Sequence, residues 1–325
     1  MPETWIVTDG AVGMEAQGIA VAEAVGLPYT LKRVKPAGLM RMIPIRFQHL
    51  VPAEGRIAAS ESSSPLDPPW PRLVISIGRR SVPLALAIKR LGGAYGLHIQ
   101  NPKVPAYLFD LIAAPVHDDF EAPNVISTFG AVHSVTASRL NEAGARYAPQ
   151  IADLPHPRIA VLRGGESRAF SFPPEVGTRL GYRLAKLARE CGGTLLITPS
   201  RRTGPDTLSA VSEAVKDVPH VVWEGRGENP YFAFLSLADA IVVTEDSVNM
   251  VTEATGTGKP VYTQPLPGRS SRLARFHALM RERGATRPFE GHIDPFDYAP
   301  VNDTEAVAAP IRKALGLESA EYNEL

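Results

Sequence analysis

The chain has 325 residues with a formal net charge of zero, and 44 % of them are hydrophobic and 21 % charged. This composition is typical of a globular protein with a real core, and the length fits two domains of ordinary size. The charge balance gives no overall attraction to nucleic acid, and the single cysteine, Cys191, excludes an intramolecular disulfide and a cysteine-rich zinc site.

The N-terminus enters a strand-like segment directly, without the basic and apolar regions of a secretory signal. No run of 18 apolar residues predicts a transmembrane helix. We therefore expect a cytoplasmic protein.

The first half of the chain alternates strand and helix patterns. The predicted strands are Trp5–Val7, Leu73–Ile77, Gly96–Gln100, Leu111–Ala113 and Asn124–Ser127. Helices are predicted from Met14 to Val25 and from Ser81 to about Leu91. The basic stretch from Lys32 to Arg46 looks irregular, and the Ser- and Pro-rich stretch from Ala58 to Pro71 predicts a loop.

The second half repeats this alternation after a Pro-rich segment, Pro149 to Pro157, which predicts a linker. Its predicted strands are Arg158–Leu162, Thr194–Thr198, Val221–Trp223, Ala240–Val243 and Pro260–Tyr262. Its predicted helices are Pro173–Cys191, Thr207–Lys216, Pro230–Ala238 and Ser270–Arg283. We expect an α/β protein with two facing, doubly wound Rossmann-like domains, residues 1–153 and 154–303. A C-terminal helix and tail, residues 304–325, should pack back on the first domain. Ligands of such sheets bind beyond the carboxyl ends of the strands, here in a cleft between the domains.

The segment from Thr244 to Ala254 is the most informative of the chain. It follows a β-branched strand, and Asp246 or Ser247 is placed to cap the helix that comes next. Glu253 can share one helix face with Asp246 and Asn249. A helix N-terminus with a carboxylate two turns later suits a phosphate and a ribose, although an ordinary capped βαβ unit has the same pattern.

Basic or Gly-rich turns follow most of the other predicted strands, for example Gly164-Gly165 and Arg201-Arg202. Glycines allow close approach to a phosphate, and arginines can contact it through two nitrogens. No Gly-x-Gly-x-x-Gly follows either first strand, which weakens a nicotinamide-cofactor interpretation. The sequence therefore predicts diphosphate binding without a Walker motif. The candidate binding residues are Gly164, Gly165, Ser200, Arg201, Arg202, Thr203, Ser247, Asn249, Met250 and Glu253.

Candidate catalytic residues lie in the first half. His117, beside Asp118 and Asp119, can act as a general base, but a metal-binding pair or a plain surface loop would look the same. Asp9 is the second candidate base, or a cap of the first helix. We predict no metal site, since no histidine spacing supports zinc, and no Gly-x-Ser-x-Gly supports a hydrolase.

Several segments carry a resemblance to a known family. They are Ile75–Ser81, Ile99–Lys103, Phe109–Asp118, Thr198–Thr203, the Glu245-Asp246-Ser247 turn and Gly258-Lys259-Pro260. With these, the chain resembles the mitochondrial-fission Elm family from Trp5 to about Tyr298.

The second half is also similar in layout to GT-B glycosyltransferases, with Gly164-Gly165-Glu166-Ser167 at the place of a Gly-Gly-Ser turn. Ser247, Asn249, Met250 and Glu253 stand at the matching donor-binding positions. The resemblance implies a metal-independent transferase with a UDP- or GDP-type sugar donor in the second domain and an acceptor in the first. Glu166 departs from the pattern by adding a negative charge beside the expected diphosphate.

Two other functions fit the same residues. One is a sugar-nucleotide epimerase of GT-B fold, and the other is a non-enzymatic adaptor recruited to a membrane. The acceptor is expected to be a glycan or a lipid-linked molecule of the cell envelope, and the nucleotide-sugar to be the other partner. Basic residues interleaved with Met40, Met42 and Ile43 between Lys32 and Arg46 suit peripheral contact with anionic lipid, or a solvated loop.

Overall fold

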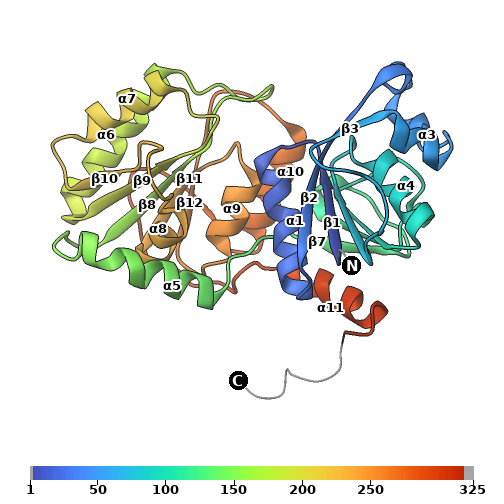
Figure 1. Ribbon diagram of the computed structural model, residues 1–325. Helices are drawn as coiled ribbons and strands as arrows, with labels where there is room; N and C mark the ends of the chain where they lie inside the picture. Colours follow the sequence, from blue (N-terminus) through green and yellow to red (C-terminus); the bar gives the residue numbers. More distant parts are fainter. Residues whose placement is uncertain (1–2, 318–325) are drawn as a thin grey trace. The chain divides into compact units, whose positions relative to one another are not determined.

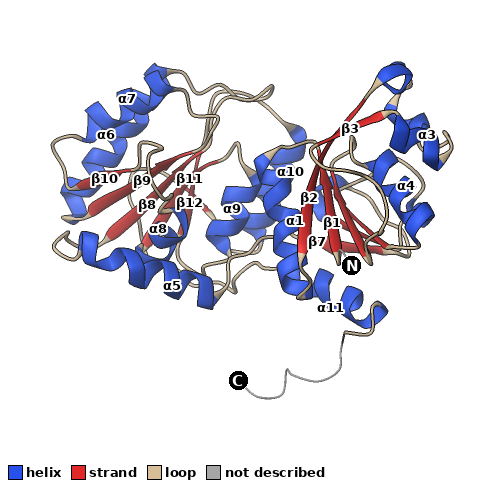
Figure 2. Ribbon diagram, in the orientation of Figure 1, coloured by secondary structure: helices blue, strands red, loops and turns tan. Residues whose placement is uncertain are grey.

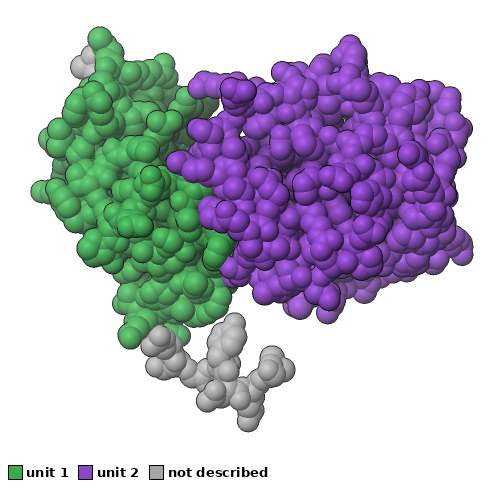
Figure 3. Space-filling model, turned by 180° about the vertical axis from the view of Figure 1, so that it is seen from behind, with its two compact units in different colours: residues 1–134, 303–325 green, residues 135–302 purple. Residues whose placement is uncertain are grey.

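The computed structural model describes residues 3–317, apart from the side chain of Leu39 (Figure 1). The chain forms two compact units, coloured separately in Figure 3. Unit 1 comprises residues 1–134 and 303–325, and unit 2 comprises residues 135–302. The predicted C-terminal tail beyond Leu317 lies outside the described residues.

The sheet of unit 1 has seven strands in the order β3-β2-β1-β4-β5-β6-β7. The strands are β1 (Thr4–Thr8), β2 (Tyr29–Pro36), β3 (Ser60–Ser62), β4 (Leu73–Ile77), β5 (Tyr95–Ile99), β6 (Leu111–Pro115) and β7 (Val125–Thr128). Every neighbouring pair is parallel except β2 with β3. The carboxyl ends of β1, β4, β5 and β6 therefore meet at one edge of the sheet.

Helices cover both faces of this sheet (Figure 2). They are α1 (Val12–Val25), α2 (Ile45–Gln48), α3 (Ala53–Ala58), α4 (Val82–Gly92) and α11 (Thr304–Ala314), with short 3-10 turns η1 (Gly38–Met42), η2 (Ala106–Leu108) and η3 (Val116–Asp118). The expected return of the C-terminal helix is found in α11. Its Val307 and Ile311 are fully buried in the core that α1 forms with the sheet, because an amphipathic helix is stable only where its apolar face is covered.

The sheet of unit 2 has six strands, all parallel, in the order β10-β9-β8-β11-β12-β13. They are β8 (Arg158–Arg163), β9 (Thr194–Pro199), β10 (His220–Val222), β11 (Ala240–Thr244), β12 (Val261–Gln264) and β13 (Arg287–Pro288). The helices are α5 (Ala137–Tyr147), α6 (Pro174–Cys191), α7 (Pro205–Val215), α8 (Tyr231–Leu237), α9 (Val248–Thr255) and α10 (Ser271–Glu282), with η4 at Ala148–Ile151. The fold class is thus as predicted, two parallel α/β sheets of Rossmann-like topology.

The units divide between Ser134 and Val135, so the predicted linker at Pro149–Pro157 lies inside unit 2. The reason is helix α5, which the sequence analysis did not predict. Its Arg139 lies over the Phe232 ring at 4.4 Å, and its Tyr147 ring meets that of Phe234 at 5.4 Å. These contacts fix α5 on α8 and bring it into unit 2.

Strand β2 was also missed, within the stretch interpreted as irregular. Lys32 occupies one of its buried positions, and its ammonium group lies 4.2 Å from the Trp5 ring centroid and donates to the Pro65 carbonyl at 2.6 Å. A lysine at a core position hides the alternation that identifies a strand.

Candidate functional site

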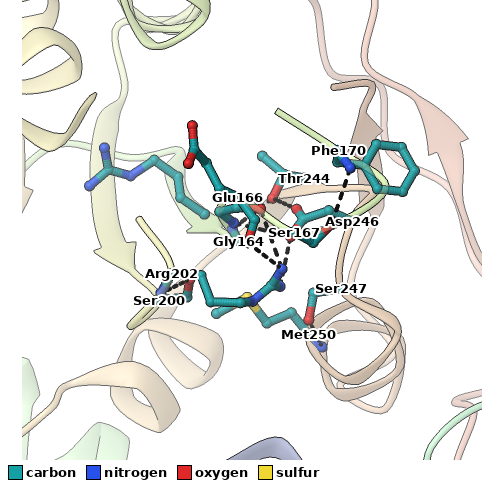
Figure 4. A network of polar contacts seen from close by, with 12 residues as sticks. Gly164, Glu166, Ser167, Phe170, Ser200, Arg202, Thr244, Asp246, Ser247 and Met250 are labelled. Carbon is teal, nitrogen blue, oxygen red and sulfur yellow. Dashed lines mark hydrogen bonds and ion pairs between the residues drawn. The ribbon is translucent and has the colours of Figure 1, made fainter. Parts of the chain in front are cut away.

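A buried carboxylate joins three strand ends of unit 2. The Asp246 side chain accepts hydrogen bonds from the Gly165 amide at 3.0 Å and from the Thr244 hydroxyl at 2.7 Å. The Arg202 guanidinium donates to it at 2.7 Å. These partners lie at or just after the ends of β8, β9 and β11, and Figure 4 shows Arg202 and Thr244 beside Asp246. One carboxylate therefore holds the three turns in a fixed arrangement.

The two glycines after β8 are needed for this close packing. A Cβ on Gly164 would lie 2.1 Å from Asp246 Oδ1, and one on Gly165 would lie 2.1 Å from the Arg202 backbone. Their amides are already used, because Gly164 donates to Thr244 Oγ1 at 2.7 Å and Gly165 to Asp246. The pair thus serves the packing of the turn in this structure, and a direct amide–phosphate contact would require these bonds to be exchanged.

The turn after β9 is tied to the same place. The Ser200 amide donates to the Arg163 carbonyl at 2.8 Å, and the Thr203 hydroxyl donates to the Gly164 carbonyl. Arg202 is occupied by Asp246, whereas Arg201 is exposed on the same turn. Both arginines are exposed, and Arg201 differs from Arg202 in having no hydrogen bond or ion pair among the described residues.

Helix α9 starts beside the network. Ser247 is its N-cap, with the hydroxyl accepting from the Met250 amide at 3.3 Å, which decides between the two caps considered from the sequence. Asn249 and Met250 are half-buried in its first turn. The first amides of the helix have no carbonyl partner within it, and the helix dipole adds a partial positive charge at this end.

Glu253 lies in the last turns of α9 and accepts a hydrogen bond from the Tyr231 hydroxyl at 2.6 Å. Burial raises the pKa of this carboxyl to about 7, against the lowering effects of the Tyr231 hydrogen bond and of the charge on Arg139. The same burial raises the pKa of Tyr231 well above its usual value. Glu253 thus changes its charge close to neutral pH, a property common among functional carboxyls.

A cavity of about 800 Å³ lies in unit 2 between α5, α8 and the loop that follows β10. Its lining combines arginines and aromatic rings, Arg139, Arg146, Arg226, Tyr147, Trp223 and Phe232, with two carboxylates, Glu142 and Glu228. Glu228 pairs with Arg146 at 3.4 Å. Arg139 connects it to Glu253, because this arginine lines the cavity and its charge acts on the Glu253 carboxyl. The volume and the lining suit a ligand that has a flat ring and negative charge.

Arg163, the last residue of β8, is a buried cation of a different kind. Its side chain is fully buried, and among the described residues its three guanidinium nitrogens have no hydrogen-bond partner. Burial lowers the pKa of this guanidinium to about 10. The charge is therefore held at a cost in free energy that no anion among residues 3–317 offsets.

The candidate catalytic residues of unit 1 lie at strand ends but apart from each other. Asp9 follows β1, accepts from the Ala11 amide at 3.3 Å and approaches Arg80 at 3.7 Å. His117 is only 1 % exposed in the η3 turn after β6, with its Nε2 3.9 Å from Asp118 Oδ1. Strands β4 and β5 lie between β1 and β6, which separates the two sites by about 14 Å at the usual strand spacing. They are alternatives rather than partners, and the base role of each remains a prediction.

The structure gathers the predicted residues of unit 2 into two groups. Gly164, Gly165, Ser200, Arg202 and Thr203 belong to the Asp246 network, while Ser247, Asn249, Met250 and Glu253 belong to α9. The sequence analysis missed Asp246 as the centre of the network, and it missed Tyr231, Arg139 and Trp223. Of these residues, only Trp223 has a position in the sequence that indicates a binding role, because it comes directly after β10.

Residues 3–317 contain no group of three or more His, Cys, Asp or Glu side chains arranged to hold a metal ion. Within the same residues, no helix has both the length and the apolar character required to cross a bilayer.

Comparison with solved structures defines the fold class. The chain is similar to MurG of Acinetobacter baumannii, with a TM-score of 0.50, 15 % identity and coverage of 97 % of this chain and 90 % of the other. The UDP-GlcNAc 2-epimerase of Methanocaldococcus jannaschii gives a TM-score of 0.57 at 11 % identity, covering 98 % and 100 %. The UDP-GlcNAc 2-epimerase of Neisseria meningitidis, solved with UDP-GlcNAc bound, gives 0.52 at 13 % identity, covering 98 % and 100 %. The protein thus has the GT-B fold that glycosyltransferases share with nucleotide-sugar epimerases, and at these identities the likeness concerns the fold alone.

Residues 12–315 match the family described as Mitochondrial fission ELM1, and the chain belongs to this family. The Mitochondrial fission protein ELM1 of Arabidopsis thaliana is 31 % identical over 274 residues, which are 75 % of this chain and 64 % of the plant protein. The chain thus spans less than two thirds of the length of that relative. The family resemblance inferred from the sequence motifs is confirmed.

Proposed function

We propose that the protein is a metal-independent glycosyltransferase that binds a nucleotide-sugar donor in unit 2. The observation that carries the proposal is Glu253, a carboxyl with a pKa of about 7 that is influenced by the charge of Arg139, a residue that lines a cavity of about 800 Å³. A carboxylate suits a ribose because its two oxygens accept hydrogen bonds from two neighbouring hydroxyls.

The donor is assigned to three neighbouring places. Glu253 takes the ribose, and the base lies in the cavity against Trp223 or Phe232, with Arg139 nearby. The diphosphate lies at the N-terminus of α9, near Ser247 and Asn249, with Arg201 as the available guanidinium. Gly164, Gly165, Ser200, Arg202 and Thr203 then support the site by holding Asp246 and the turns.

Catalysis needs a base that removes the proton of the acceptor hydroxyl. His117, supported by Asp118, is our first candidate, and Asp9 is the second, since its carboxylate is closer to the surface. His117→Ala should lower turnover by about 100-fold while donor binding persists. Turnover that survives this change and is lost in Asp9→Asn assigns the base to Asp9. The acceptor is proposed to be a glycan or a lipid-linked molecule.

The first test is thermal unfolding with UDP-, GDP-, ADP- and CMP-sugars. A nucleotide that binds the folded protein must raise its unfolding temperature, and we expect one of the first two to do so. No shift with any of them at millimolar concentration would contradict the proposal and favour the adaptor function.

The second test compares Glu253→Gln with Glu213→Gln, an exposed change on α7 that removes only the surface pairing with Lys216. Calorimetry should show that Glu253→Gln weakens binding of the free nucleoside diphosphate by about 1.5–3 kcal/mol. Glu213→Gln should bind as the wild type does. Equal affinity of both variants would remove Glu253 from the site.

A third measurement separates transfer from epimerisation. The responding nucleotide-sugar is incubated without acceptor and followed by NMR. Conversion to an epimer would show that the GT-B fold serves the epimerase reaction here, whereas transfer requires an acceptor.

A further inference from the structure

Three large apolar side chains are exposed within nine residues of unit 1. Met42 is 80 % exposed, Leu50 70 % and Phe47 46 %. Only five other large hydrophobic residues are exposed among those described, and they are scattered: Val12, Tyr29, Tyr107, Val116 and Tyr182. The segment from Arg41 to Leu50, which contains the end of η1 and all of α2, is thus a local concentration of exposed apolar surface.

The segment is held in place from within. Gln48 is buried, and its side-chain amide donates to the Met40 carbonyl at 2.8 Å and to the Ile43 carbonyl at 2.9 Å. Met40 is also buried. These contacts anchor the inner side of the segment, so its apolar residues are displayed outward on a fixed backbone rather than on a loop that could fold them inward.

Positive charge accompanies the apolar residues. From Ala24 to Ala53 the sequence has no Asp or Glu, and its cations are Lys32, Arg33, Lys35, Arg41 and Arg46. Some of them are already used, since Lys32 is buried, Arg33 pairs with Glu15 and Arg41 with Glu61. Lys35 and Arg46 are exposed and have no carboxylate partner among the described residues, and Arg46 lies over the Phe47 ring at 4.7 Å.

We propose that the segment Arg41–Leu50 binds the surface of an anionic phospholipid bilayer. Met42, Phe47 and Leu50 would enter the acyl boundary, and Arg46 and Lys35 would contact the lipid phosphates. Apolar tips flanked by cations have the chemistry of such an interface. Three side chains supply much less than the roughly 800 Å² that each partner contributes to a specific protein interface, which favours a membrane over a protein partner.

The test is sedimentation of the intact chain with vesicles of phosphatidylcholine alone or with about 30 % phosphatidylglycerol, at low and high salt. We expect binding to the anionic vesicles at low salt, weakened by salt because the lipid attraction is screened. The double variant Phe47→Ser/Leu50→Ser should lower the partition coefficient by at least about tenfold. Arg46→Gln should lower it by about fivefold, the effect of one basic residue.

The matched control is Tyr107→Ser/Tyr182→Ser, which removes two exposed rings outside the segment and should bind as the wild type does. Circular dichroism and unfolding temperatures of all variants establish that they are folded.

The proposal is overturned if the wild type stays in solution with anionic vesicles at low salt, or if neutral vesicles bind it equally well. It is also overturned if Phe47→Ser/Leu50→Ser binds like the wild type. Self-association that this variant abolishes, without vesicle binding, would identify a second copy as the occupant. Because the assay contains no nucleotide and its test variants change residues of unit 1 only, its result is independent of the proposed donor site.

Discussion

Two carboxylates on the β11–α9 segment, Asp246 and Glu253, have opposite surroundings. Asp246 is buried and accepts from an amide, a hydroxyl and a guanidinium. Glu253 accepts from one neutral hydroxyl, and burial raises its pKa to about 7. A carboxylate saturated with donors holds a scaffold, whereas one that accepts a single hydrogen bond and has a raised pKa is suited to a ligand. The six residues between them separate a structural role from a candidate binding role.

The largest expected effect concerns Asp246. Asp246→Ala leaves the Arg202 guanidinium, the Thr244 hydroxyl and the Gly165 amide without their acceptor. Because Arg202 is 40 % exposed and can be hydrated, we expect a loss of about 2–4 kcal/mol of stability in urea unfolding. Asp217→Ala, at an exposed position, should stay within about 0.5 kcal/mol of the wild type. Similar midpoints for both variants would show that the network is not what holds the turns.

The raised pKa of Glu253 should make the stability of the protein depend on pH. Its folded-state pKa of about 7 is above the ordinary value of 4.5, so the folded state retains a proton that the unfolded state releases. The stability that this proton provides is complete below about pH 4.5 and is lost as pH rises through 7. Glu253→Gln does not titrate, so it should gain about 2 kcal/mol relative to the wild type between pH 5 and pH 8. A pH-independent difference between the two would contradict the raised pKa.

The close packing over Gly164 gives a smaller effect. Gly164→Ala forces a methyl group against the Asp246 carboxylate, which overpacking data place at about 1–3 kcal/mol. Gly204→Ala is the control, because the nearest atom to its Cβ, Thr207 Oγ1, is 4.0 Å away and its φ of −62° is suitable for alanine. Urea unfolding measures the stability of both variants. A Gly164→Ala variant as stable as the wild type would mean that the turn holding Asp246 can move to admit the methyl group.

Arg163 extends the comparison to a charge without a partner. Arg163→Met keeps an unbranched side chain and removes the desolvation of the guanidinium, so stability should rise by about 1 kcal/mol. A loss of stability instead would show that the guanidinium has an anionic partner in solution. Thermal unfolding of the wild type and of Arg163→Met, with and without the responding nucleotide-sugar, distinguishes the two kinds of partner. A partner within the chain affects stability without the nucleotide-sugar, whereas a bound ligand does so only when it is present.

Local patterns in the sequence determined much of the fold. Continuous β-branched runs such as Leu73–Ile77 and Ala240–Val243 marked buried parallel strands almost to their ends, because such strands need apolar residues on both faces. Polar turns after those strands marked the edge where α9 begins. The motifs also indicated the family. What local patterns could not give was Lys32 at a core position of β2, since the Trp5 ring and the Pro65 carbonyl that accommodate it are distant in the sequence.

The roles of the site residues were decided only by the tertiary structure. Gly164 and Gly165 looked free to approach a phosphate, but their amides bond to Thr244 and Asp246, about 80 residues further along the chain. Glu253 was identified from its position on a helix, yet its raised pKa is caused by burial in the folded chain, which outweighs the lowering effects of Tyr231 and Arg139 from other helices. A sequence shows which groups can donate, accept or ionise. Only the folded chain decides which of them are already satisfied by one another and which keep a hydrogen bond or a charge for a ligand.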